Sequence, residues 1–218
     1  MSRQLGCVAV QVAIVVFEGV TLLDAVGPYH VWRSLPGVEV VWVAERPGVV
    51  GDGRGGAVVA EYGLEEVARP DVVCVPGGPG QEALMGGGAV VDWVRAVDEG
   101  SAWTVSVCTG ALVLAAAGLL EGRRATTHWL ARGELGAWGV RVVEERVVFD
   151  GKYASGAGVS AGIDVALALG GRLVGVEAAQ RVQLMSEYDP APPWDAGSPG
   201  RAPGSVVAWA RERSRFCR

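Results

Sequence analysis

The sequence predicts an α/β fold: one domain with a mostly parallel sheet sandwiched between helices. Short runs rich in Val and Ile alternate with longer segments rich in Ala and Leu, which is the pattern of βαβ units. The 218 residues are 50% hydrophobic, which is enough to bury a large core and too much for a disordered chain. We expect one domain over 1–218, with its core over about 8–208 and a C-terminal tail over 209–218.

Five valine-rich runs are expected to form strands, because β-branched side chains favour extended backbone. Glycine or proline follows several of these runs closely, as in Pro76-Gly77-Gly78-Pro79-Gly80, and such residues end strands. The expected strands span 10–17, 38–43, 71–75, 103–107 and 140–148.

The segments between these runs predict helices that cover both faces of the sheet. The expected helices span 22–34, 81–85, 90–99, 110–117, 163–173 and 176–188. A proline-rich stretch at 189–193 ends the regular pattern. The last eight residues, 211–218, carry four arginines, and we expect them to form a frayed, solvated tail.

Charge and hydropathy exclude several classes of partner. Nineteen basic residues against twenty-four acidic ones give a net charge of −5 and no basic stripe, so we expect no nucleic-acid partner. The apolar run 8–17 is too short to span a bilayer, and no signal-peptidase site of the usual form follows it. We therefore expect no membrane partner and a cytoplasmic protein.

The four cysteines indicate neither a disulfide framework nor a metal site. Cys7, Cys74, Cys108 and Cys217 form no CxxC pair and lack the spacing of metal ligands. Cys74 lies in an apolar run and is expected to pack in the core, whereas Cys7 and Cys217 lie near the termini. We expect reduced thiols and no metal.

Cys108 carries the sharpest local signal. A strand is expected to end at Val107 and a helix to begin just after Cys108, with the small residues Ser106 and Gly110 two positions to either side. This is the pattern of a nucleophile elbow. The helix N-terminus would favour thiolate, so we expect a depressed pKa for Cys108. The alternative is a buried, inert cysteine.

The residues that follow other strands supply candidate partners for Cys108, because ligands bind beyond the carboxyl ends of parallel strands. The N–H groups of Gly78 and Thr109 are candidate oxyanion donors, although Gly77-Gly78 also fits a plain turn. Asp24 lies in an otherwise apolar stretch and is either an acid/base beside the thiol or a helix-capping carboxylate.

The chain contains two histidines. His128 lies twenty residues after Cys108 in a loop or strand end, and a Cys–His dyad is one hypothesis for it. His30 lies six residues beyond Asp24 on the first helix, and we expect it at the surface or behind the site.

Five segments together resemble the ThiJ/PfpI superfamily, which has the flavodoxin-like fold of class I glutamine amidotransferases. They are LLDAVGPYHVW at 22–32, VPGGPGQEALM at 75–85, SVCTGALVLAAAGLLEGRRATTHW at 106–129, AGIDVALAL at 161–169 and AQRVQLMSEYDPAPPWDAGSP at 179–199. The His-x-Glu pair of true glutamine amidotransferases is missing, because Trp129-Leu130 follows His128. Amide hydrolysis by a full triad is therefore disfavoured.

Within this superfamily the chain is similar to the isonitrile hydratases, which place Asp rather than Glu beside the cysteine. The resemblance implies that Cys108 is the nucleophile, Asp24 the acid/base and Thr109 a pocket residue. It implies that Gly78 supplies an amide donor and that His128 lies near the thiol.

The activity implied is hydration of an isonitrile to an N-substituted formamide, with a small-molecule substrate, no cofactor, no metal and a homodimeric assembly. The alternative is a stress-response or redox-sensing protein in which Cys108 is oxidised. Deglycase or chaperone action is a further possibility for the superfamily, with no residue here that distinguishes it.

Overall fold

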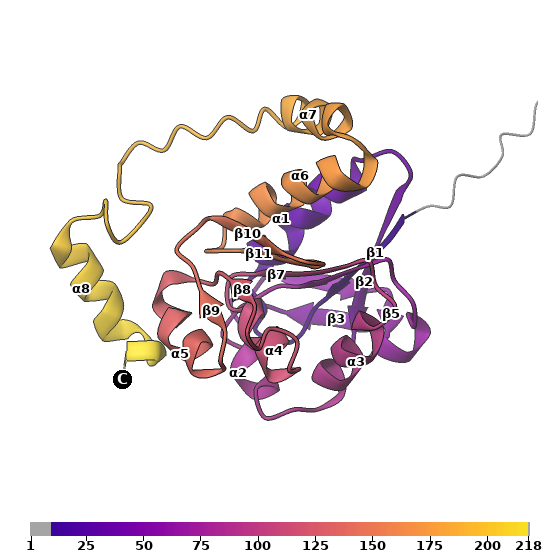
Figure 1. The fold of residues 1–218 in the computed structure, drawn as a ribbon, viewed down its shortest axis with the longest axis horizontal. Coiled ribbons are helices and arrows are strands. Elements are labelled where there is room, and N and C mark those ends of the chain that lie inside the picture. Colours follow the sequence, from indigo (N-terminus) through magenta and orange to yellow (C-terminus); the bar gives the residue numbers. More distant parts are fainter. Residues whose placement is uncertain (1–9, 218) are drawn as a thin grey trace, which may run out of the picture.

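A seven-stranded sheet forms the centre of the computed structural model, which describes residues 10–217 (Figure 1). All neighbouring strands are parallel except the edge pair β10 and β11. The predicted mostly parallel sheet is therefore confirmed. The strand order is β10 (Val147–Asp150), β11 (Tyr153–Gly156), β7 (Trp103–Val107), β6 (Val72–Val75), β1 (Val10–Val15), β2 (Val38–Ala44) and β5 (Tyr62–Gly63).

Helices cover both faces of the sheet, as the alternating sequence pattern predicted. Figure 1 shows α1 (Leu22–Arg33), α6 (Ala161–Val174) and α7 (Val176–Met185) on one face. The opposite face carries α2 (Gln81–Leu84), α3 (Ala89–Asp98), α4 (Gly110–Ala116) and α5 (Arg132–Ala137).

The sheet divides the core into two apolar clusters, and strand β1 contributes buried side chains to both. Ala13 and Val15 face the cluster of α3 and α4, whereas Val12 and Ile14 face the cluster of α1 and α6. On the face covered by α1 and α6, the buried Trp32 indole donates its N–H to the Ala166 carbonyl at 3.0 Å, which joins these two helices. This packing fixes where α1 begins, just beyond the carboxyl end of β1.

The predicted strand at 140–148 is wrong in its middle. The structure contains two short strands there, β9 (Arg141–Val142), which pairs with β8 (Arg124–Ala125), and β10. Between them, Glu144 pairs with Arg132 at 2.9 Å, and Arg146 pairs with Asp164 at 2.6 Å. These charged side chains form ion pairs outside the sheet, and the backbone between β9 and β10 belongs to no strand.

Several short elements were not predicted, and one of them lies near the carboxyl edge of the sheet. The hairpin of β3 (Gly48–Gly51) and β4 (Ala57–Ala60) is joined by a loop over 52–56. The single turns η1 (Leu64–Glu66) and η2 (Trp129–Ala131), the strands β5, β8 and β11 and the helix α5 were not predicted either.

The C-terminal residues fold back onto the body, so the expectation of a frayed tail is wrong. An irregular segment over 186–203 leads to α8 (Gly204–Arg213) and the turn η3 (Arg215–Cys217), which lies against η2 (Figure 1). Phe216 packs partly buried against the cluster of α3 and α4. Arg215 pairs with Glu82 at 2.7 Å and donates to Gln81.

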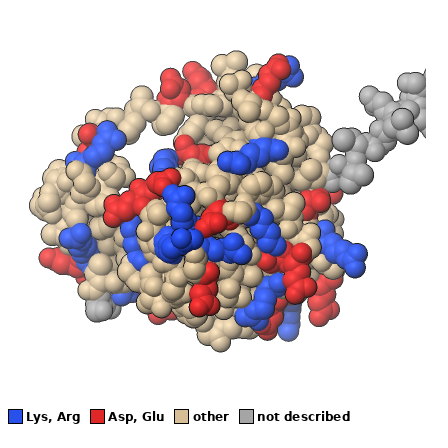
Figure 2. Space-filling view, viewed as in Figure 1, with Lys and Arg blue, Asp and Glu red and all other residues tan. Residues whose placement is uncertain are grey.

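The surface is mixed in charge on the face that Figure 2 shows, where basic and acidic side chains are interspersed. None of the helices within residues 10–217 combines the length and apolar character needed to cross a membrane.

Docking of the C-terminal turn has a direct consequence for proteolysis. In a variant carrying Arg215→Gln and Phe216→Ala, the ion pair and the apolar contact are both lost, so α8 should open more often. We expect trypsin to cleave after Arg211 and Arg213 several-fold faster than in the wild type, as followed by mass spectrometry.

The matched control is Arg69→Gln, which removes one arginine far from the C-terminal segment along the chain. Equal cleavage rates in the double variant and the wild type would show that the two contacts do not hold the C-terminal turn.

Candidate active site

Cys108 lies on a strained turn between β7 and α4. Its φ of 56° is in the left-handed region, which non-glycine residues rarely adopt and which is common at functional sites. The Cys108 N–H donates to the Gly156 carbonyl at 3.0 Å. A Cβ at Gly110 would overlap the Val75 carbonyl oxygen, so this position requires glycine. The turn therefore has the geometry of the predicted nucleophile elbow.

Asp24 lies in the first turn of α1 and is fully buried. Its Oδ2 accepts the Gly77 N–H at 3.0 Å, and its carboxyl lies beside the Cys108 side chain. Its Oδ1 has no nitrogen or oxygen partner in the described part of the chain. Asp24 thus joins α1 to another loop and does not cap its own helix.

Burial raises the pKa of Asp24 from 3.8 to about 7, against the opposing effects of the Gly77 N–H and the Cys108 side chain. Such a carboxyl changes protonation near neutral pH, which is the property required of an acid/base catalyst. A carboxyl with this pKa can both accept and return a proton during one reaction.

The expectation of a depressed Cys108 pKa is wrong. Burial is the largest effect and raises the pKa of the thiol, and the charge of Asp24 raises it further. The Thr109 N–H and hydroxyl act in the opposite direction but are outweighed. The thiol and the carboxyl titrate as a coupled pair. Near neutral pH this pair therefore consists of a thiol beside a carboxyl that is partly ionised.

The backbone of Gly77 and Gly78 approaches the elbow closely. The Gly78 N–H donates to Thr109 Oγ1 at 3.0 Å, so it does not face open space as the predicted oxyanion donor would. Since Thr109 Oγ1 accepts this bond, its own proton is free to point toward the Cys108 sulfur. A Cβ at Gly77 would overlap the Thr109 side chain and N–H, so this residue must also be glycine.

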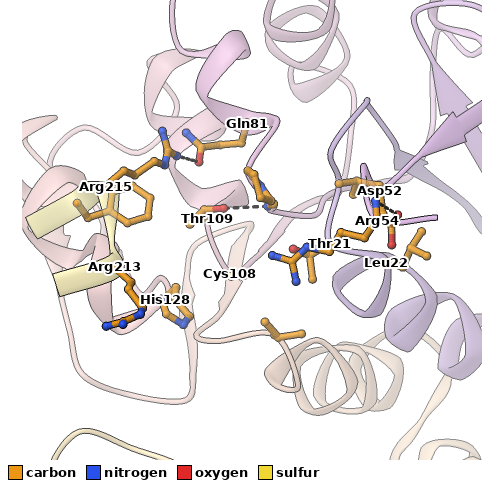
Figure 3. Close-up of a pocket in the computed structure, with 15 residues that line it drawn as sticks. Thr21, Leu22, Asp52, Arg54, Gln81, Cys108, Thr109, His128, Arg213 and Arg215 are labelled. Atoms are coloured by element: carbon orange, nitrogen blue, oxygen red, sulfur yellow. Dashed lines mark hydrogen bonds between the residues drawn. The ribbon is translucent and has the colours of Figure 1, made fainter. Parts of the chain in front are cut away.

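A cavity of about 570 Å³ opens above Cys108 (Figure 3). Its walls come from the ends of several strands, from the loop over 52–56 and from the C-terminal segment. The lining residues are Val20, Thr21, Leu22, Asp52, Arg54, Gly78, Pro79, Gln81, Cys108, Thr109, His128, Val159, Arg213, Arg215 and Phe216. Sequence reasoning missed Arg54, Gln81 and the C-terminal residues, because no local motif indicates contacts at this range.

His128 lines the cavity, but a Cys–His dyad is not formed. Its Nδ1 accepts the Leu130 N–H at 3.4 Å. Burial, followed by the charge of Arg132, lowers the His128 pKa, so the ring is neutral near pH 7. The Thr127 hydroxyl, which sequence reasoning also missed, donates to the Cys108 carbonyl at 2.8 Å and fixes this loop against the elbow.

The remaining candidates lie elsewhere. His30 is exposed and hydrogen-bonds to Ser186 at 2.9 Å, as expected for a residue outside the site. Cys74 is fully buried in the core and Cys217 is exposed, whereas Cys7 lies outside the described residues. Within residues 10–217, no group of three His, Cys, Asp or Glu side chains is arranged to hold a metal ion.

Comparison with known proteins places this geometry in context. The sequence pattern of the DJ-1/PfpI family matches residues 10–170. Isonitrile hydratase of Pseudomonas putida is 46% identical over 94% of this chain and 90% of its own length. A deglycase of Pyrococcus abyssi is 30% identical over 64% of this chain and 82% of its own. The crystal structure of a ThiJ/PfpI family protein from Pseudomonas syringae superposes with a TM-score of 0.91 at 36% identity, covering 96% and 88% of the two chains.

The raised Asp24 pKa predicts an unusual dependence of stability on pH. Between pH 3.8 and about 7 the folded chain holds a proton that the unfolded chain has lost, so the free energy of unfolding falls as the pH rises. Asp24→Asn is neutral throughout and escapes this loss. Its stability relative to the wild type should increase from pH 4 to pH 8 by an amount on the order of 2–4 kcal/mol, as measured by urea unfolding.

The control is Asp92→Asn, which changes an exposed carboxylate on α3 and should follow the wild-type pH trend. A constant difference between Asp24→Asn and the wild type across this pH range would mean that Asp24 ionises normally.

Proposed function

Because the chain belongs to the DJ-1/PfpI family, we propose that it is an isonitrile hydratase that converts an isonitrile into an N-substituted formamide. The observation that carries the proposal is the buried Asp24 carboxyl, which lies beside Cys108 and has a pKa of about 7. The 46% identity to the Pseudomonas putida enzyme over nearly the whole chain supports the same activity.

In the first step, Cys108 Sγ attacks the terminal carbon of R–N≡C. The thiol proton passes to the Asp24 carboxylate, which transfers it to the same carbon. A C–S bond and a C–H bond form, the S–H bond breaks, and one C–N π bond is lost. The product is a thioimidate, R–N=CH–S–Cys108, and Asp24 is again ionised.

In the second step, Asp24 takes a proton from water as the water oxygen bonds to the thioimidate carbon. Asp24 gives this proton to the nitrogen, which has received the C=N π electrons, and R–NH–CH(OH)–S–Cys108 results. The C–S bond then breaks, and the hydroxyl proton returns through Asp24 to sulfur. One water is consumed, R–NH–CHO leaves, and the original thiol and carboxylate are restored.

Thr109 and Gly78 support these steps by holding the sulfur in place. The Thr109 hydroxyl, fixed by the Gly78 N–H, donates toward sulfur and stabilises negative charge when the C–S bond breaks. His128 stays neutral and shapes the cavity wall, where it contacts substrate without transferring a proton. No step requires a cofactor or a metal.

The geometry favours the hydratase over a redox sensor. Oxidation of cysteine proceeds through an accessible thiolate. Here Cys108 is 6% exposed, and burial together with the Asp24 charge keeps the sulfur protonated. A buried thiol beside a proton acceptor suits a reaction in which the substrate enters the cavity and receives the thiol proton through Asp24.

The proposal extends to a cytoplasmic homodimer. Val176, Leu184 and Met185 of α7 are 65%, 80% and 85% exposed, which leaves an apolar surface available for a second copy. Light scattering of the purified protein should give about twice the chain mass of 22.6 kDa. A single-chain mass at micromolar concentration would contradict the dimer and leave the catalytic proposal intact.

The catalytic proposal is tested with a simple alkyl isonitrile and detection of the formamide by chromatography. Cys108→Ala should abolish turnover, and Asp24→Asn should lower kcat by about 100-fold or more, because proton transfer is lost. The wild-type kcat/KM should rise with pH through about 7, as Asp24 becomes the ionised base.

Cys217→Ser, which removes an exposed thiol outside the cavity, is the matched control and should retain full activity. Circular dichroism of each variant verifies folding. Turnover by folded Cys108→Ala would exclude the covalent mechanism, and absence of turnover in the wild type would exclude the hydratase.

A further inference from the structure

The mouth of the active-site cavity is positively charged in a protein whose net charge is −5. Three arginines line the cavity, Arg54, Arg213 and Arg215, against the single carboxylate of Asp52. A local excess of positive charge in an acidic protein attracts anionic ligands and repels cations.

Two of these four charged groups are already engaged by the protein. The Asp52 Oδ1 accepts the backbone N–H groups of Arg54 and Gly56 at 2.7 and 2.9 Å, so this carboxylate serves to order its own loop. Arg215 pairs with Glu82 at 2.7 Å and donates to Gln81, and it thereby holds the C-terminal turn in place.

Of the other two guanidinium groups, that of Arg54 remains available. Within residues 10–217, no acidic oxygen lies within 4.0 Å of the Arg54 guanidinium. Arg213 has a long contact of 3.7 Å with the adjacent Glu212, donates to the Trp209 carbonyl at 3.4 Å and lies against the Trp209 ring, so it is partly engaged. Figure 3 shows Arg54 and Arg213 entering the cavity from opposite sides, with Cys108 between them.

The loop that carries Arg54 is ordered by its own hydrogen bonds. Gly53 and Gly55 have positive φ values of 72° and 102°, and the Asp52 carboxylate closes the loop between them. The Gly51 N–H donates to the Glu18 carboxylate at 3.3 Å, which attaches the hairpin to the end of β1. A cationic side chain presented on such a loop loses little backbone freedom on binding an anion.

We propose that the substrate of this cavity carries a carboxylate, which Arg54 binds while the reacting group lies at Cys108, with Arg213 adding to the positive potential from the opposite wall. The planar guanidinium fork matches a carboxylate with two parallel N–H···O bonds. This inference rests on the proposed function, since it identifies the substrate class as isonitriles with an anionic substituent.

The test compares isocyanoacetate with its methyl ester, a pair that differs in charge and hardly in reach. The wild type should have the higher kcat/KM for the carboxylate, mainly through a lower KM. Added salt should reduce this preference, because ionic screening weakens exposed charge pairs.

Arg54→Gln should raise the KM for isocyanoacetate about five- to tenfold more than the KM for the ester, in keeping with exposed charge-assisted contacts. Arg213→Gln should act in the same direction and more weakly, because it removes positive potential from the opposite wall. Arg69→Gln is the matched control: Arg69 precedes β6, lies outside the cavity lining, and should leave both KM values unchanged.

The outcomes separate this inference from the catalytic proposal. Equal or better use of the ester by the wild type, or equal effects of Arg54→Gln and Arg69→Gln, would overturn the anion site while the hydratase stands. If neither isonitrile reacts, the hydratase fails. Calorimetry with N-formylglycine then decides the anion site: binding that Arg54→Gln weakens supports it, and absence of binding overturns it.

Discussion

The contact between a buried carboxyl and a buried thiol constrains the whole active site. Asp24 comes from α1 and Cys108 from the turn after β7, so no local segment brings them together. The sheet does, because β1 lies beside β6 and β6 beside β7, and their carboxyl ends meet at one edge. Two hydrogen bonds then hold the start of α1 against the loop of Gly77. The Gly77 N–H donates to the Asp24 carboxyl at 3.0 Å, and the Thr21 N–H donates to the Gly77 carbonyl at 2.8 Å.

The burial of Asp24 lowers the stability of the fold and raises the pKa of its carboxyl. Asp24 Oδ1 is buried without a nitrogen or oxygen partner in residues 10–217, and burial of an ionisable group with incomplete hydrogen bonding is costly. The same burial moves its pKa to about 7. A second N–H donor at Oδ1 would stabilise the fold and also return the carboxyl to its ordinary acidity. In the proposed mechanism Asp24 exchanges protons with sulfur, carbon and nitrogen, so the protein cannot satisfy all of its hydrogen-bonding capacity.

Sequence reasoning succeeded where structure is determined locally or by simple periodicity. The small residue Gly110 was predicted as part of the nucleophile elbow, and a Cβ there would overlap the Val75 carbonyl oxygen. The acidity of Cys108 was predicted in the wrong direction, because the argument from the helix N-terminus omitted the apolar cluster around the sulfur and the charge of Asp24. The docking of Arg215 on Gln81 was missed for a related reason: 134 residues separate them, and no local pattern indicates such a contact.

The parts of the site that were missed include the arginines that we propose select the substrate. The predicted residues Asp24, Cys108 and Thr109 lie at strand ends and helix starts, where the sheet fixes them. Arg54 and Arg213 lie on a hairpin loop and on a C-terminal helix outside the region matched by the family pattern. Loops and added elements change more easily than a rigid scaffold. Because α8 and η3 reach the body through Arg215 and Phe216 rather than through the elbow, changes in this segment can alter substrate preference without moving the Asp24–Cys108 pair.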